Sequence, residues 1–289
     1  MMKRILGIAL VSIMAMSLLV GCSAKTADTG TTENAPAPEQ KTVTINGSTS
    51  VQPLAEELAK KFSEKHPEIK VDIQGGGSGV GIKSANDGVV DIGMSSRELK
   101  AEEAGLKEFK IAIDGIAVIL NPANKVTNLT KEQLMNIYTG QISNWKDVGG
   151  ADAAITVVTR EEGSGTRGAF IELTGVEVKE GDKKVDKTVD TAITQGSTGA
   201  VVTTVSQDPN AIGYASFGAA KSKTEVVMIS VDGVAISEDA IYGKTYVLSR
   251  PFLFLTKAEP AGAAKEFIDF VLSAEGQEVV ASKHFLKAN

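Results

Sequence analysis

The sequence predicts an α/β protein, because strand-like and helix-like segments alternate along most of its 289 residues. β-branched runs at 42–46 and 69–74 predict strands, and between them Leu54, Leu58 and Phe62 recur at helical spacing. Turns rich in glycine, serine and threonine connect such segments, and the chain holds 29 glycines. The strand–helix–strand repetition implies right-handed crossovers and a mainly parallel sheet.

The remaining elements follow from local signals. The first helix should end at His66, because the residue before Pro67 disfavours helical geometry, and His66 should lie solvated at that end. Thr130 and Gln133 form a capping-box pattern at the start of a later helix. Further helices are expected at 82–86, 130–138, 167–173, after 199 and at 260–272, and further strands at 89–94, 155–159, 212–217, 226–231 and 246–255.

Charge and residue counts exclude several classes of protein. The chain carries 30 Lys and Arg against 36 Asp and Glu, a net charge of −6, with no basic run, which argues against a nucleic-acid-binding protein. One cysteine and two histidines exclude a disulfide framework within the chain and a zinc site built from cysteine and histidine alone. We therefore expect neither a metal nor another cofactor, and no catalytic site.

The first 40 residues are expected to direct and tether the protein. Lys3 and Arg4 precede an apolar run of 16 residues, short for a membrane span of about 20, which predicts a signal peptide over 1–21. Its end resembles the bacterial lipoprotein box, so cleavage would leave Cys22 as a lipidated N-terminus carrying acyl chains such as palmitate. An ordinary signal peptide beside a chance cysteine is the alternative. Residues 22–40, rich in Thr, Ala and Pro, predict a flexible tether.

Four turns repeat one construction, in which a Gly/Ser/Thr segment leads from a strand into a helix. They lie at 47–50, 75–81, 163–166 and 196–199, and Arg160 precedes the third. Glycine permits close approach to a ligand, and helix N-termini present unpaired N–H groups with partial positive charge. In an open α/β sheet such turns lie at one edge, beyond the carboxyl ends of the strands. Four of them predict a site for a small oxyanion, although each alone would be explained by ordinary capping and turn formation.

Four ordered motifs resemble the phosphate-binding lipoprotein family of high-affinity phosphate ABC transporters. These are INGSTSV at 45–51, GGGSG at 75–79, DIGMSS at 91–96 and REEGSGT at 160–166, and the resemblance runs from about Thr42 to the C-terminus. It implies a type II periplasmic-binding-protein fold, with two α/β domains joined by crossover strands and a ligand cleft between them. Domain I would span 41–113 plus 246–289, and domain II 114–245.

The same resemblance implies a set of phosphate ligands. Arg160 would be the cationic contact and Glu162 the acidic partner that holds its guanidinium. The donors around it would be Thr49, Ser50, Ser78, Ser96, Ser164, Gly165 and Thr166.

Ser96 departs from the family pattern, which commonly has an aspartate there to accept a proton from hydrogen phosphate. A hydroxyl can donate or accept, so binding of another tetrahedral oxyanion (sulfate, molybdate or tungstate) remains an alternative. Arg97 beside it could point into the cleft or form a solvated salt bridge.

The leading hypothesis is a non-enzymatic receptor that captures inorganic phosphate and delivers it to the permease subunits of an ABC transporter. We expect a monomer, lipid-anchored to the outer face of the bacterial cytoplasmic membrane. A secreted phosphate-handling enzyme and a surface lipoprotein with an incidental cleft are less favoured alternatives, the former because no histidine is well placed for catalysis.

Overall fold

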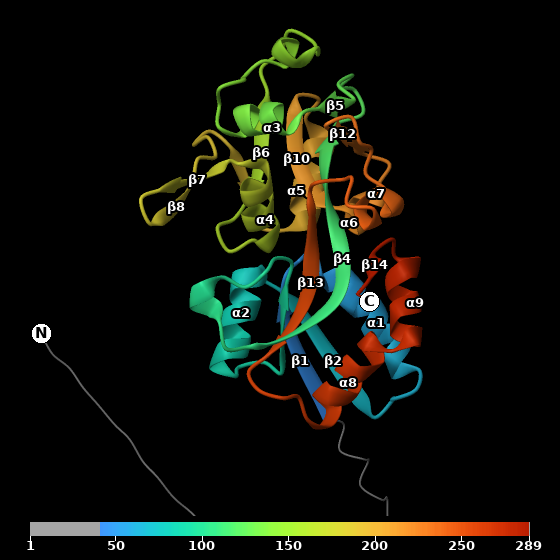
Figure 1. The fold of residues 1–289 in the computed structure, drawn as a ribbon. Coiled ribbons are helices and arrows are strands. Elements are labelled where there is room, and N and C mark those ends of the chain that lie inside the picture. Colours follow the sequence, from blue (N-terminus) through green and yellow to red (C-terminus); the bar gives the residue numbers. More distant parts are fainter. Residues whose placement is uncertain (1–40, 289) are drawn as a thin grey trace, which may run out of the picture. The chain divides into compact units, whose positions relative to one another are not determined.

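The computed structural model describes residues 41–288, which lie within the compact unit Pro38–Asn289. The expected signal peptide, the tether and Cys22 lie outside these described residues. The described part is an α/β fold built on one ten-stranded sheet, which confirms the expected fold class (Figure 1). Among the residues described, none forms a helix with the length and apolar character that a membrane crossing requires.

The strands are β1 (Lys41–Gly47), β2 (Ile69–Gly75), β3 (Ile92–Ser95), β4 (Lys107–Leu120), β5 (Asn128–Leu129), β6 (Thr156–Arg160), β7 (Glu177–Glu180), β8 (Lys183–Asp186), β9 (Ile193–Gln195), β10 (Ala211–Ser216), β11 (Val227–Met228), β12 (Ser230–Val231), β13 (Ser249–Thr256) and β14 (Leu286–Lys287). The α-helices are α1 (Gln52–Ser63), α2 (Ser78–Asp87), α3 (Lys131–Tyr138), α4 (Gly165–Thr174), α5 (Thr198–Gln207), α6 (Phe217–Lys221), α7 (Glu238–Tyr242), α8 (Gly262–Leu272) and α9 (Ala274–Ser282). Two short 3₁₀ helices cover Ala101–Glu103 and Trp145–Val148.

Most elements expected from the sequence are present, with shifted ends. The helix expected at 82–86 begins at Ser78, and the segment 226–231 divides into two short strands, β11 and β12. The capping box at Thr130 is confirmed, because its hydroxyl accepts from the N–H of Gln133 at 3.0 Å and the Gln133 side chain accepts from the N–H of Thr130 at 2.9 Å.

The main sheet is parallel at its two ends and antiparallel in the middle. Its order is β2-β1-β3-β13-β4-β10-β6-β9, with β11 and β14 also paired to β4. β1 pairs in parallel with β2 and β3, and β6 pairs in parallel with β10 and β9, as strand–helix–strand units require. By contrast, β13 is antiparallel to both β3 and β4, and β10 is antiparallel to β4. The expectation of a mainly parallel sheet therefore holds only away from these central strands.

The buried side chains form two main clusters, which define two lobes of the structure. One cluster packs β1, β3 and parts of β4 and β13 against α1, α8 and α9; we call this half the α1 lobe. The other cluster, together with a smaller one beneath α5, packs β10 and the remainder of β4 against α3, α4 and α5; we call it the α5 lobe. Tyr138 and Trp145 are both buried in the α5 lobe.

Strands β4 and β13 carry the chain from one lobe to the other. They run side by side in antiparallel pairing between the two groups of helices in Figure 1. The expected domain boundaries at 113/114 and 245/246 lie in or beside this pair of strands and remain a prediction. In the pairing, Arg250 lies directly opposite Asp114, and their side chains are 2% and 0% exposed.

Replacing Asp114 by asparagine is expected to flatten the pH dependence of stability. Burial raises the pKa of Asp114 from 3.8 to about 6, so between these values the folded state holds a proton that the unfolded state has lost. The contribution of this carboxyl to stability is complete below its unfolded pKa and is lost as the pH rises through the folded pKa.

The free energy of unfolding of the wild type, minus that of Asp114→Asn, should therefore fall by about 1–3 kcal/mol between about pH 4.5 and pH 7. Urea titrations at the two pH values measure it. A difference that stays constant, or that grows toward pH 7, would contradict the raised pKa.

Candidate anion-binding site

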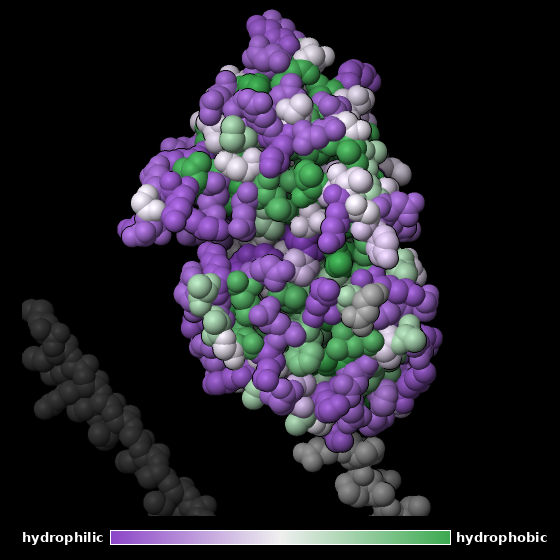
Figure 2. Space-filling model, in the orientation of Figure 1, coloured by the Kyte–Doolittle hydropathy of each residue, from purple (hydrophilic) through white to green (hydrophobic). Residues whose placement is uncertain are grey.

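Four helix N-termini converge where the two lobes meet, two from each lobe. The hydroxyl of Ser50, just before α1, lies 2.8 Å from the hydroxyl of Thr166 in α4 and 2.8 Å from that of Thr198 in α5. At the start of α2, the N–H of Gly79 donates to the carbonyl of Gly163, before α4, at 2.9 Å. The convergence expected from the four Gly/Ser/Thr turns is thus confirmed. Figure 2 shows hydrophilic groups at the level where the lobes meet.

Arg160 lies at the end of β6 with its side chain 2% exposed, and it contacts both lobes. Nη2 donates to the hydroxyl of Thr49 from the α1 lobe, and Nη1 donates to that of Thr198 from the α5 lobe, each at 3.1 Å. Nε donates to the carbonyl of Gln195 at 3.2 Å. Two further bonds, from Nε and Nη2, reach the carboxylate of Glu161 at 2.7 Å each. A guanidinium has five N–H donors, so one N–H of Nη1 remains available among the described residues.

The carboxylate partner of Arg160 is Glu161, and the prediction of Glu162 was wrong. The chain turns immediately after β6, with the N–H of Ser164 donating to the carbonyl of Glu161 at 3.0 Å. In this turn the Glu161 side chain folds back on the guanidinium as a bidentate partner, while Glu162 is exposed.

Ser78 and Ser96 belong to the α1 lobe, and their hydroxyls lie against the first turn of α4. Both are fully buried, and the N–H of Ser96 donates to the hydroxyl of Ser78 at 3.0 Å. Gly165 faces them so closely that a Cβ there would overlap the Ser78 hydroxyl and lie 2.8 Å from that of Ser96. Only glycine therefore lets the first turn of α4 approach these two serines.

The other residues implied by the resemblance have defined places. Ser164 is the N-cap of α4, where its hydroxyl accepts from the N–H of Arg167 at 3.2 Å, and it is 3% exposed. Arg97 forms a bidentate ion pair with Glu103 at 2.6 and 2.7 Å. Of the two alternatives for Arg97, the salt bridge is therefore the one observed, but it is mostly buried and not solvated.

Thr198 is a candidate site residue that the sequence did not single out. It is 3% exposed, its hydroxyl lies next to Ser50, and it also accepts from Arg160. Thr198 belongs to the Gly/Ser/Thr turn at 196–199, but none of the four family motifs covers that turn. Its backbone N–H also donates to the hydroxyl of Thr49, at 3.2 Å.

This arrangement suits one small oxyanion. Helix N-termini, hydroxyls and a guanidinium all offer hydrogen-bond donors, and helix dipoles add partial positive charge. Because the charge of Arg160 is balanced by Glu161, selection here depends on the number and direction of donors more than on net charge.

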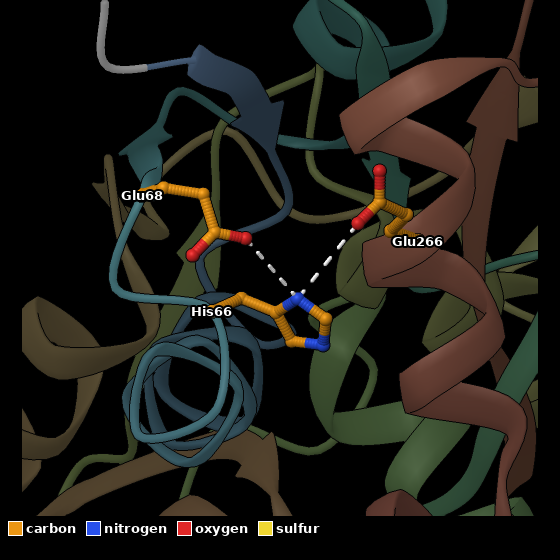
Figure 3. Close-up of side chains that lie close together, drawn as sticks. All are labelled: His66, Glu68 and Glu266. Atoms are coloured by element: carbon orange, nitrogen blue, oxygen red, sulfur yellow. Dashed lines mark ion pairs between the residues drawn. The ribbon is translucent and has the colours of Figure 1, made fainter. Parts of the chain in front are cut away.

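Two features elsewhere in the described residues do not contribute to this site. A shallow groove of about 510 Å³ runs between α1 and β2, lined in part by Lys60 and Lys70. His66 faces Glu68 and Glu266 (Figure 3), and its Nδ1 lies 3.5 Å and 3.7 Å from their carboxylate oxygens. Both acids are more than 40% exposed, and exposed ion pairs contribute little to stability. His66 follows the far end of α1, about 18 Å from the anion site by helical rise.

Comparison with known proteins agrees with this geometry. Residues 32–275 match the model of the PBP superfamily domain. The chain is 34% identical over 244 residues to the phosphate-binding protein PstS of Bacillus subtilis, covering 82% of this chain and 77% of that protein. It is 31% identical to PstS of Borreliella burgdorferi over 99% of both chains.

Among solved structures, a putative phosphate ABC transporter substrate-binding protein from Clostridium perfringens, with bound phosphate, is 44% identical. The match has a TM-score of 0.80 and covers 86% of this chain and 99% of that one. The fold and the site define a substrate-binding protein of the PBP superfamily. Within that class, the chain belongs to the PstS family of phosphate-binding proteins.

Replacing Gly165 by alanine is expected to separate α4 from α2. The new Cβ would overlap the Ser78 hydroxyl, so the hydrogen bond from Gly79 to Gly163 should break and the Gly79 amide should exchange faster with solvent. Hydrogen exchange followed by NMR measures this rate. Gly163→Ala is the matched control, since a Cβ there meets nothing within 4 Å. Equal protection of Gly79 in both variants would contradict the close approach.

Proposed function

We propose that this protein captures inorganic phosphate outside the cytoplasm and delivers it to the permease of an ABC transporter. The observation that carries the proposal is the set of buried donors around Arg160, drawn from both lobes. The bound phosphate of the Clostridium perfringens protein, which is 44% identical, supports the choice of ligand. We infer that the chain acts as a receptor without enzymatic activity, like the binding proteins to which it is similar.

The proposed ligand set keeps the residues expected from the sequence and adds one. Thr49, Ser50, Ser78, Ser96, Arg160, Ser164, Gly165 and Thr166 would donate to phosphate, together with Thr198. Glu161 would hold the guanidinium of Arg160 in place. Their backbone and hydroxyl donors come from both lobes, so a bound anion would favour the closed arrangement by bridging them.

The proposed mechanism of capture is closure about the crossing strands. Domain I would comprise 41–113 and 246–289, and domain II 114–245. The separate buried clusters of the α1 and α5 lobes support two domains, although Tyr246, Leu248 and Leu286 pack in the cluster of the α5 lobe. Phosphate held between the domains would be shielded from water until the permease favours opening. We expect the receptor to act as a monomer.

Calorimetric titration of phosphate tests the ligand and one of its contacts. The wild type should bind phosphate, and Thr198→Val should bind it about tenfold more weakly, because one hydroxyl that faces Ser50 and Arg160 is lost at similar side-chain volume. Thr203→Val is the control, since Thr203 is exposed on the same helix. Equal affinity in the two variants would remove Thr198 from the ligand set.

Sulfate, titrated in parallel, tests the alternative anion. The observation that favours it is the Ser96 hydroxyl, which offers no carboxylate to reject an anion that lacks a proton. Binding of sulfate without phosphate would overturn the proposed function.

We further propose that Cys22 carries the lipid anchor and that residues 22–40 tether the domains to the membrane. Cys22→Ser should abolish acylation, since the chain has no other cysteine, and release the protein from membranes. Fractionation of bacteria that express either form, followed by immunoblotting, measures this. Retention of the variant on membranes would contradict the proposed anchor, and unchanged phosphate affinity is the control for its folding.

A further inference from the structure

A buried ion pair joins the two crossing strands behind the anion site. Asp114 of β4 and Arg250 of β13 are directly opposed in the antiparallel register. Oδ2 of Asp114 accepts from Nη2 of Arg250 at 3.1 Å and from Nε at 3.3 Å. The side chains are 0% and 2% exposed, so both charges are removed from water and depend on each other.

Each member of the pair also reaches into a different lobe. Nη1 of Arg250 donates to the carbonyl of Ser96 at 3.2 Å, at the end of β3 in the α1 lobe. Oδ1 of Asp114 accepts from the hydroxyl of Ser216 at 3.0 Å, at the end of β10 in the α5 lobe. The ion pair therefore connects Ser96 of the candidate site to Ser216 at the end of β10 in the opposite lobe.

Ser96, whose carbonyl accepts from Arg250, is one of the proposed phosphate ligands. The N–H of Ser96 donates to the Ser78 hydroxyl, and the two hydroxyls lie 3.3 Å apart, against Gly165 of α4. Arg250 holds the carbonyl of this same residue. A shift of that carbonyl would turn the peptide that carries the Ser96 side chain, and would move its hydroxyl relative to α4.

We propose that Arg250 is a positioning residue for anion binding, which fixes Ser96 in the site, and that Asp114 fixes Arg250 to both crossing strands. This inference rests on the proposed function, because its readout is phosphate affinity. Buried ion pairs are often no more stabilising than apolar replacements, so stability alone does not account for this pair. The specific gain is the hydrogen bond from Arg250 to Ser96, which no apolar side chain can make.

The test separates positioning from stability. Arg250→Met alone leaves the Asp114 carboxylate buried without its partner and should destabilise the fold strongly. The double variant Asp114→Asn/Arg250→Met removes both charges and keeps an oxygen that can accept from Ser216, so its melting temperature should recover toward that of the wild type. Its phosphate affinity, measured by calorimetry, should nevertheless stay about tenfold lower, because Ser96 has lost its anchor.

A second variant serves if the double variant does not fold. Arg250→Lys keeps a positive charge beside Asp114 but cannot span both Asp114 and Ser96, because an ammonium is a point donor where a guanidinium is a planar fork. It should remain folded, with about tenfold weaker phosphate binding and faster hydrogen exchange at the Ser96 amide. The control is Lys107→Met/Glu259→Gln, which removes an exposed ion pair between the start of β4 and the segment after β13 and should leave affinity unchanged.

Phosphate affinity within twofold of the wild type in either folded Arg250 variant would overturn the inference. Failure of the wild type itself to bind phosphate would overturn the proposed function instead. The two failures are thus distinguished by the wild-type titration.

Discussion

The geometry of the site depends on the need of a buried guanidinium for hydrogen-bond acceptors and a balancing charge. Arg160 obtains them from both lobes, since Thr49 and Thr198 belong to opposite sides of the junction and Glu161 supplies the balancing charge. An unpaired charge at this depth would be very costly; Glu161 pairs it within the α5 lobe, and Thr49 adds an acceptor from the α1 lobe. Residues far apart in the chain are thereby held within hydrogen-bond distance of one another.

A second constraint comes from the way the chain connects the lobes. It crosses between them only through β4 and β13 in the described residues, and these strands are antiparallel because the chain leaves the α1 lobe along one and returns along the other. Each lobe can then form its own parallel strand–helix units on either side. The carboxyl ends of those parallel strands face the junction, which is why the Gly/Ser/Thr turns meet there.

Local patterns in the sequence were enough to predict the fold class and the four turns that meet at the junction, whereas the individual ligand residues followed from the family resemblance and remain a proposal. The four turns could be found because glycine and hydroxyl residues at a strand–helix junction have a direct physical meaning. The choice of Glu162 over Glu161 failed because the direction of a side chain in a tight turn depends on hydrogen bonds that sequence spacing does not reveal. Arg250 could not be paired with Asp114 in advance, since 136 residues separate them and only the strand register brings them together.

The pairing of each buried arginine with its own carboxylate has a consequence for how an anion is attracted. Arg160 with Glu161, and Arg250 with Asp114, leave almost no net charge at the junction, within a protein that is acidic as a whole. Long-range attraction of the ligand is therefore weak, and the binding energy comes from short, directional hydrogen bonds. Such short contacts are screened by dissolved ions less than a long-range attraction would be.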